Sequence, residues 1–140
     1  MSQVMLNDYT VKPEKGKIYI PKIELGSSGI FKIIGSSFME NPLHFYEPLF
    51  EWIGEFMKSG KAIELHLLPD YYNTSSAKCV DRLIRTLKSY KDTGNQAKVF
   101  WYYEENDSDN LDDGEDYQAL VDIPFEIISF QGKEYPISIA

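Results

Sequence analysis

The sequence holds one cysteine, two histidines and no long apolar run, and each shortage excludes a class of protein. A lone Cys79 cannot form an intramolecular disulfide, and its apolar neighbours predict a small buried side chain rather than a reactive thiol. His44 and His66 have no cysteine or carboxylate at zinc-ligand spacing, so no metal site is expected. The N-terminus lacks a secretory signal and no segment has the roughly 20 apolar residues that span a bilayer, which predicts a cytoplasmic protein without a membrane partner.

Positive charge is also scarce, because 14 Lys and Arg face 22 Asp and Glu, for a net charge of −8. This balance disfavours binding to a phosphate backbone, so nucleic acid is not an expected partner. Several of the basic residues nevertheless recur on one side of a predicted helix, at Lys78, Arg82, Arg85 and Lys88. This stripe is either a docking surface for an acidic protein or an ordinary solvated helix face.

The 140 residues suit one domain, 1–140, which is long enough to bury a core and too short for two. Apolar stretches on both sides of Gly26-Ser27-Ser28-Gly29 predict a β-hairpin whose first core strand starts after Pro21. Asn41-Pro42 predicts a helix start. The apolar residues of that helix recur every three or four positions, as in a helix with one buried side.

The second half of the chain alternates strands and helices. Lys61–Leu68 has the alternation of a strand with one buried face, and Val80, Leu83, Ile84 and Leu87 mark the inner side of a helix that ends near Thr93-Gly94. The continuous apolar run 99–103 predicts a strand covered on both faces. Segments 117–121 and 125–130 predict a short helix and a last strand. The result is an α/β fold with a mixed, largely parallel sheet of about five strands and helices packed against it.

The stretch Glu104–Asp116 is dominated by carboxylates and predicts a solvated acidic loop. A calcium-binding EF-hand loop does not fit its register. If Gly114 is the sixth loop position, the third is Leu111 and the twelfth is Leu120, and neither supplies a side-chain oxygen. Weak cation binding of another kind, or contact with a partner, stays open for this stretch.

The sequence offers no assignable catalytic residues. It has no Gly-rich phosphate loop followed by Lys-Ser/Thr and no Gly-x-Ser-x-Gly elbow, so neither an enzyme nor a cofactor is expected. A small-ligand enzyme would need a pocket lined by Trp101, Tyr102 and Tyr103. Core packing is the favoured interpretation of these aromatic residues, because a continuous apolar strand belongs inside an α/β sheet.

A cluster of hydroxyl side chains, Asn73-Thr74-Ser75-Ser76, stands out in a predicted loop, Pro69–Ser76, between a buried strand and an amphipathic helix. Residues of these types cap helix starts. The positive end of the helix dipole also tolerates added negative charge, so an exposed hydroxyl here suits phosphorylation. Capping and phosphorylation are compatible.

Several short motifs, in this order and spacing, resemble the SiaC family of bacterial regulatory phosphoproteins over nearly the whole chain. They are Pro21-Lys22-Ile23-Glu24-Leu25, Gly35-Ser36-Ser37 with Glu40-Asn41, Phe45-Tyr46-Glu47-Pro48-Leu49 with Trp52, Tyr72-Asn73-Thr74-Ser75-Ser76, and Gly114-Glu115-Asp116-Tyr117 leading to Ile123-Pro124-Phe125-Glu126. Two positions depart from the family pattern, Pro42 after Asn41 and the small-residue turn at 26–29. The resemblance implies a fold similar to the anti-sigma-factor antagonist (STAS) class.

The resemblance further implies a non-catalytic phospho-switch. A protein kinase would phosphorylate Thr74, with Ser75 and Ser76 as less favoured acceptors, and a metal-dependent phosphatase would reverse this. The unphosphorylated form would bind and activate a diguanylate cyclase, which connects the protein to cyclic di-GMP signalling and biofilm control. The expected partner-binding residues are Asn73, Thr74, Ser75, Ser76, Lys78, Arg82 and Arg85. The alternatives are another output protein, an anti-sigma-factor antagonist, and a constitutive scaffold that binds through 104–116.

Overall fold

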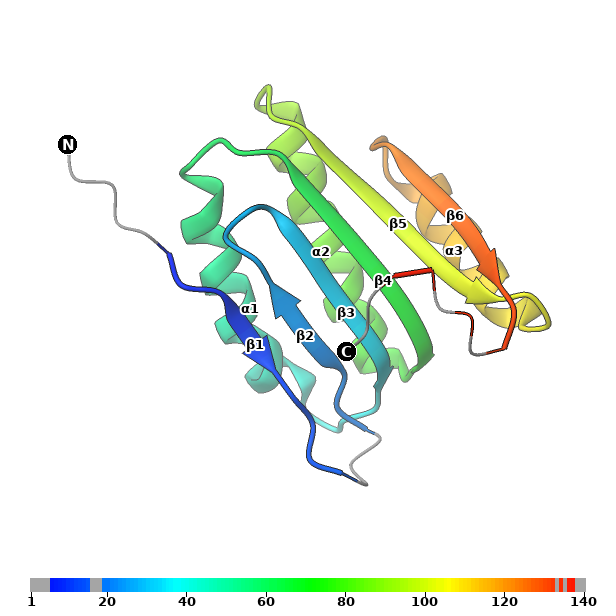
Figure 1. The fold of residues 1–140 in the computed structure, drawn as a ribbon. Coiled ribbons are helices and arrows are strands. Elements are labelled where there is room, and N and C mark those ends of the chain that lie inside the picture. Colours follow the sequence, from blue (N-terminus) through cyan, green and yellow to red (C-terminus); the bar gives the residue numbers. More distant parts are fainter. Residues whose placement is uncertain (1–5, 16–18, 133, 135, 138–140) are drawn as a thin grey trace.

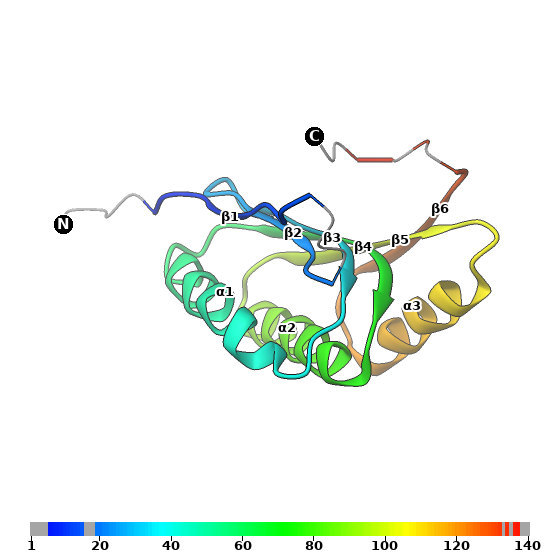
Figure 2. The same ribbon diagram turned by 90° about the horizontal axis from the view of Figure 1, so that it is seen from below.

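The computed structural model describes residues 6–15, 19–132, 134 and 136–137, and shows one mixed sheet with three helices. The helices all pack on the same face of the sheet (Figures 1 and 2). The elements in chain order are β1 (Tyr9–Val11), β2 (Lys22–Leu25), β3 (Ile30–Ser37), α1 (Pro42–Met57), β4 (Ile63–Tyr72), α2 (Thr74–Asp92), β5 (Ala97–Glu104), α3 (Ser108–Leu120) and β6 (Phe125–Phe130).

The strands lie in the sheet in the order of the sequence, β1-β2-β3-β4-β5-β6. β1, β2 and β3 pair antiparallel with one another in that order, whereas β3, β4, β5 and β6 run parallel. A single helix connects each pair of parallel strands, and these helices lie on the same face of the sheet. Right-handed crossovers give this arrangement when each new strand is added on the same side of the previous one. The carboxyl ends of β3, β4 and β5 therefore meet at one edge of the sheet, where α1, α2 and α3 begin. The predicted α/β class and largely parallel sheet are confirmed.

The core lies between the sheet and the helices. Ile63, Leu65 and Leu67 of β4 point towards it and have at most 1 % of their surface exposed. The predicted inner side of α2 is confirmed, because Val80, Leu83, Ile84 and Leu87 are all buried there. Cys79 is also buried, and this burial raises the pKa of its thiol. Within the described ranges, no helix is long and apolar enough to cross a membrane.

The hairpin was predicted correctly, with β2 starting at Lys22 and the 26–29 turn closed by Gly26 N–H donating to Ile30 O at 3.0 Å. The first helix begins at Pro42 and continues through Pro48. A sixth strand, β1, was missed. It is only three residues long and pairs with β2 as the outermost strand of the sheet. Three residues show too little alternation of apolar and polar side chains to predict a strand from the sequence.

The prediction of a loop over Pro69–Ser76 was wrong, because β4 continues to Tyr72. Its pairing with β3 extends to Ser37 opposite Tyr72, with a register shift between Gly35 and Ser37. Proline cannot donate to a ladder and is tolerated where pairing is irregular. Pro69 lies opposite Gly35, directly before this shift, and β4 continues past it, so Asn73 alone lies between β4 and α2.

The acidic stretch was also predicted wrongly, since most of it is the helix α3 and not a loop. Asp107 caps this helix by accepting from Asn110 N–H at 3.0 Å, and Asp109 lies in its first turn, where the helix dipole favours negative charge. Most of the other carboxylates project into water. Polar helices of this kind show no apolar stripe for a sequence pattern to detect.

The expectation that β5 is covered on both faces is confirmed in part. Tyr102, on the face away from the helices, is only 4% exposed, although no helix of the described part of the chain lies on that face (Figure 2). Aromatic rings cover one another there. The His66 ring stacks on Phe100 with centroids 4.5 Å apart, and Tyr102 Oη lies 2.8 Å from His66 Nδ1. Trp101, on the helix side, is fully buried. The apolar run at 99–103 thus combines core packing with cross-strand stacking, and core packing is confirmed for Trp101.

Gly114 of α3 lies directly against the Trp101 ring, and replacing it with alanine is expected to lower the free energy of unfolding by about 1–3 kcal/mol. A Cβ added at Gly114 would sit 2.5 Å from Trp101 Cδ1 and 2.6 Å from Nε1. The ring cannot simply move away, because its Nε1–H donates to Asn110 O at 2.9 Å.

Urea denaturation of Gly114→Ala would measure this loss. Gly54→Ala is the matched control, since Gly54 lies inside α1 with nothing within 4 Å of an added Cβ. Helix propensity favours alanine at both sites, so the control is expected to be neutral or stabilising. Equal or higher stability of Gly114→Ala would show that α3 does not pack this closely on Trp101.

Candidate functional site

The candidate site is the start of α2, where the edge formed by β3 and β4 meets the first helical turn. Asn73 links these elements through several bonds. Its backbone N–H donates to Ser37 O at 3.1 Å, and its side-chain Nδ2 donates to Met39 O at 2.9 Å. Its Oδ1 accepts from Ser76 N–H at 3.0 Å, which caps the helix. Asn73 therefore fixes the helix start against both the end of β3 and the segment that leads into α1.

Thr74 and Ser75 are the first two residues of α2, and both are exposed. Because Asn73 performs the capping, the hydroxyl of Thr74 is not needed for it, and no hydrogen bond holds that hydroxyl in the described part of the chain. The N–H groups of a first helical turn carry a positive partial charge. Thr74 thus presents an accessible hydroxyl at a place suited to a negatively charged group.

Ser76 differs completely from its two neighbours, because none of its surface is exposed. Its Oγ accepts a hydrogen bond of 2.8 Å from Ser37 Oγ, which in turn accepts one of 2.8 Å from Tyr46 Oη. Burial raises the pKa of Tyr46 to about 12, so its phenol stays protonated and donating. Ser76 is therefore a structural residue that joins α2 to β3 and α1, and this geometry does not fit the expected roles in phosphorylation and partner contact.

Tyr72, just before the cap, lies beneath the same helix start. Its ring packs edge-on against Trp101 with centroids 6.3 Å apart. Its hydroxyl is buried without a hydrogen-bond partner in the described part of the chain, and burial raises its pKa well above the ordinary value. Tyr117 donates to Ala77 O at 3.1 Å and so connects α3 to the first turns of α2. Aromatic side chains thus pack against the beginning of α2 and connect it to β5 and α3.

The basic residues of α2 continue outward from the site. Lys78, Arg82 and Arg85 are all exposed, which agrees with their predicted place on the outer side of the helix. Arg85 pairs with Asp81 at 2.9 Å, whereas Arg82 lies 3.8 Å from Glu47 and 4.0 Å from the centre of the Phe50 ring. The helix contains five basic and two acidic residues, so positive charge is concentrated here in a chain of net charge −8.

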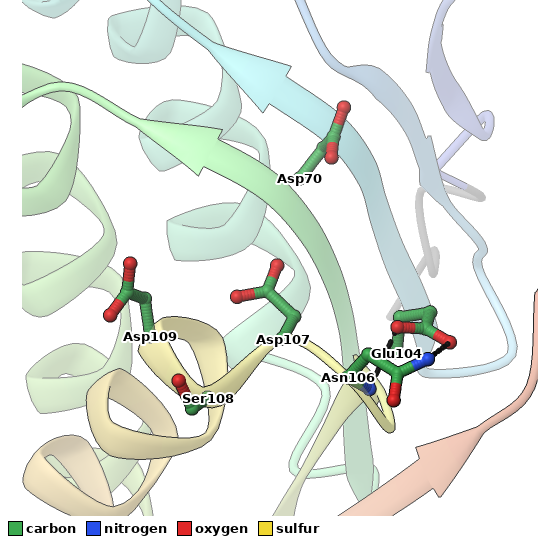
Figure 3. Close-up of a pocket in the computed structure, with 6 residues that line it drawn as sticks. All are labelled: Asp70, Glu104, Asn106, Asp107, Ser108 and Asp109. Carbon is green, nitrogen blue, oxygen red and sulfur yellow. Dashed lines mark hydrogen bonds between the residues drawn. The ribbon is translucent and has the colours of Figure 1, made fainter.

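A shallow acidic hollow lies at the same edge of the sheet, beside the start of α3 (Figure 3). It is lined by Asp70, Glu104, Asn106, Asp107, Ser108 and Asp109. Several of its oxygens already have protein donors: Glu104 accepts from Asn106 N–H at 2.8 Å, and Asp107 holds Asn110. Among the described residues, no group of three or more His, Cys, Asp or Glu is placed to hold a metal ion.

Comparison with known proteins agrees with this architecture. A model of the SiaC family of regulatory phosphoproteins matches residues 14–130. The chain belongs to this family. An uncharacterized protein of Pseudomonas aeruginosa (strain UCBPP-PA14) is 25% identical over 101 residues, which cover 71% of this chain and 80% of that protein.

Solved SiaC structures share the fold. Apo-SiaC from Pseudomonas aeruginosa superposes with a TM-score of 0.78 at 23% identity, over 89% of this chain and 98% of that one. A chain in the crystal structure of the diguanylate cyclase SiaD in complex with its activator SiaC, also from Pseudomonas aeruginosa, gives 0.81 at 22% identity, over 88% and 100%. The match to the family model confirms the predicted family, and the structure adds the buried Tyr46–Ser37–Ser76 network. No chemical signal marked Ser37 or Tyr46 in the sequence, although both lie in motifs that carry the resemblance.

Proposed function

We propose that this chain is a non-catalytic switch protein whose unphosphorylated form binds and activates a diguanylate cyclase in the cytoplasm. A cognate kinase phosphorylates Thr74, and a metal-dependent phosphatase removes the phosphate. The proposal rests on the different environments of three side chains at the start of α2. Asn73 caps the helix, Ser76 is buried, and Thr74 has an exposed hydroxyl. Membership of a family of regulatory phosphoproteins supports it, and the activator role of SiaC in the SiaD complex supports the class of partner.

A phosphate on Thr74 would be accommodated without refolding. It would lie at the positive end of the helix dipole, and its two negative charges would lie four residues before Lys78, on the same side of the helix. The modification therefore changes the charge of a surface and not the packing of the core. That is the property a reversible binding switch needs.

Two alternatives have less support. In a constitutive scaffold, the acidic segment 104–116 would make the contact and Thr74 would be irrelevant. In an anti-sigma-factor antagonist, the partner would be an anti-sigma kinase instead of a cyclase. Deletion of segment 104–116 would also remove packing, since Trp101 donates to Asn110 in α3. Surface substitutions such as Asp112→Asn with Asp116→Asn therefore test the scaffold better.

Phosphate mapping tests the acceptor directly. The purified protein would be incubated with soluble extract of its host and ATP, and phosphorylated peptides would be identified by mass spectrometry. We expect phosphate on Thr74 in the wild type, none in Thr74→Ala, and undiminished phosphate on Thr74 in Ser75→Ala. Phosphate on Ser75 alone, or none with the kinase shown to be present, would contradict the assignment of Thr74.

A further inference from the structure

Large apolar side chains on the surface are concentrated near Thr74. In the described ranges, the exposed ones are Tyr19, Ile30, Phe38, Leu43, Tyr71 and Leu120. Phe38 directly follows β3, Tyr71 lies near the end of β4, and Leu43 lies in the first turn of α1. The carbonyl of Tyr19 accepts from Phe38 N–H at 2.9 Å. Four of these side chains therefore belong to the edge of the sheet at which α2 begins.

The two most prominent of them touch each other. The rings of Phe38 and Tyr71 have centroids 6.0 Å apart and an interplanar angle of 49°, and each side chain is 56% exposed. The backbone around them is fixed, because Phe38 bonds to Tyr19 and the Asn73 N–H donates to Ser37 O. We call Phe38, Tyr71 and Leu43 the apolar patch. Its members are held in place, yet Phe38 and Tyr71 are each 56% exposed and Leu43 is 50% exposed.

A fixed, exposed aromatic pair contributes little to the core and is typical of a surface that a partner covers. Burying an exposed side chain of this size gains about 1.5–3 kcal/mol, and aromatic residues are over-represented among the side chains that dominate binding energy. Clustered apolar side chains mark interaction sites far more reliably than scattered ones. Ile30 and Leu120, by contrast, lie at the opposite edge of the sheet, at the beginning of β3 and the end of α3.

Charge next to the apolar patch indicates the chemistry of its occupant. Positive charge runs along α2 from Lys78 in its second turn onward, and Lys78 is exposed and makes no ion pair within the described residues. The exposed carboxylates of Glu40 and Asp70 lie next to the patch in the sequence, so the positive charge borders the patch only on the side of α2. A second copy of the chain, docked through the same surface, would bring two basic helices together. An occupant whose carboxylates lie only on the flank that faces α2, away from Glu40 and Asp70, is matched to this surface instead.

We propose that the apolar patch and Lys78 form the docking surface for one segment of the output protein, an amphipathic segment with apolar residues on one side and carboxylates on its flank. The apolar residues cover Phe38, Tyr71 and Leu43, and the carboxylates lie over Lys78. The identity of the output protein rests on the proposed function. A phosphate on Thr74 would compete with those carboxylates for Lys78 and repel them, which supplies the physical cause of the switch.

The test compares two double variants in the unphosphorylated state. Phe38→Ser with Tyr71→Ser removes the aromatic pair, whereas Ile30→Ser with Leu120→Ser removes two exposed apolar side chains at the opposite edge. Binding to the diguanylate cyclase of the same organism would be measured by isothermal titration calorimetry, with circular dichroism to show that both variants are folded. We expect the first to weaken binding about 100-fold and the second to change it less than about threefold.

The charge is tested in the same way. Lys78→Glu is expected to weaken binding by about tenfold or more, and Lys61→Glu, an exposed lysine near the opposite edge, to have little effect. Unchanged affinity of both Phe38→Ser/Tyr71→Ser and Lys78→Glu would overturn this docking surface but leave the proposed function standing. Sedimentation showing a wild-type dimer that Phe38→Ser/Tyr71→Ser dissociates would assign the patch to a second copy instead. Failure of the wild type to bind the cyclase would overturn the proposed function and this inference with it.

Discussion

Replacing Ser76 with aspartate is expected to lower the free energy of unfolding by about 3–5 kcal/mol, the usual cost of a buried charge without a partner. Ser76 is fully buried, and its Oγ is occupied by the hydrogen bond from Ser37. A carboxylate in its place would lose its hydration and meet no cation. Protonation would remove the charge but require free energy of its own, so the protein is destabilised in either state.

The same replacement at Thr74, two residues earlier, is expected to change stability by no more than about 1 kcal/mol and in the favourable direction. Thr74 is exposed, and a carboxylate at the first helical position interacts well with the helix dipole. Ser75→Asp should behave like Thr74→Asp. The steep contrast between adjacent hydroxyl residues follows from burial alone.

Chemical denaturation of the three aspartate variants at neutral pH measures this contrast. Ser76→Ala separates the cost of losing the hydroxyl from the cost of burying a charge, because it removes the hydroxyl without adding a charge. It should lower the free energy of unfolding by only about 1 kcal/mol. A loss of stability at Thr74→Asp as large as that at Ser76→Asp would mean that Thr74 is not an accessible surface residue.

The roles of residues 73–76 could not be predicted from the sequence. Asn73-Thr74-Ser75-Ser76 reads as four polar residues of similar chemistry, and nothing in their types distinguishes a cap from a buried hydroxyl or an exposed one. The distinction depends on Tyr46 and Ser37, which are distant in sequence and reach Ser76 only after the sheet and α1 are assembled. Tertiary contacts of this kind leave no local pattern.

Elements with a strong period were predictable. The alternation of Ile63, Leu65 and Leu67 marked β4, and the helical spacing of Val80, Leu83 and Leu87 marked the inner side of α2, because each pattern has one buried side. Elements without such a pattern were not. The last residues of β4 are of types common in turns, yet they stay paired with β3 across the register shift between Gly35 and Ser37. The helix α3 is polar almost all round, with only Asn110 and Gly114 buried.

Phosphorylation of Thr74 is expected to weaken binding to the diguanylate cyclase by about 100-fold or more, equivalent to roughly 2.7 kcal/mol. A phosphate brings nearly two negative charges to an exposed position four residues from Lys78, and like charges brought together at an interface cost several kcal/mol. The fold itself is expected to remain unchanged, since Asn73 and the buried Ser76 hold the helix start without help from Thr74.

The decisive measurement is the affinity of the cyclase for the two forms of one protein. Ser75→Ala protein would be phosphorylated to completion on Thr74, and its dissociation constant and its effect on cyclase activity would be compared with those of the untreated protein. Thr74→Ala protein taken through the same treatment is the control. The account predicts tight binding and activation by the untreated and control proteins, and loss of both when Thr74 carries phosphate. Equal affinity and equal activation with and without phosphate on Thr74 would contradict it.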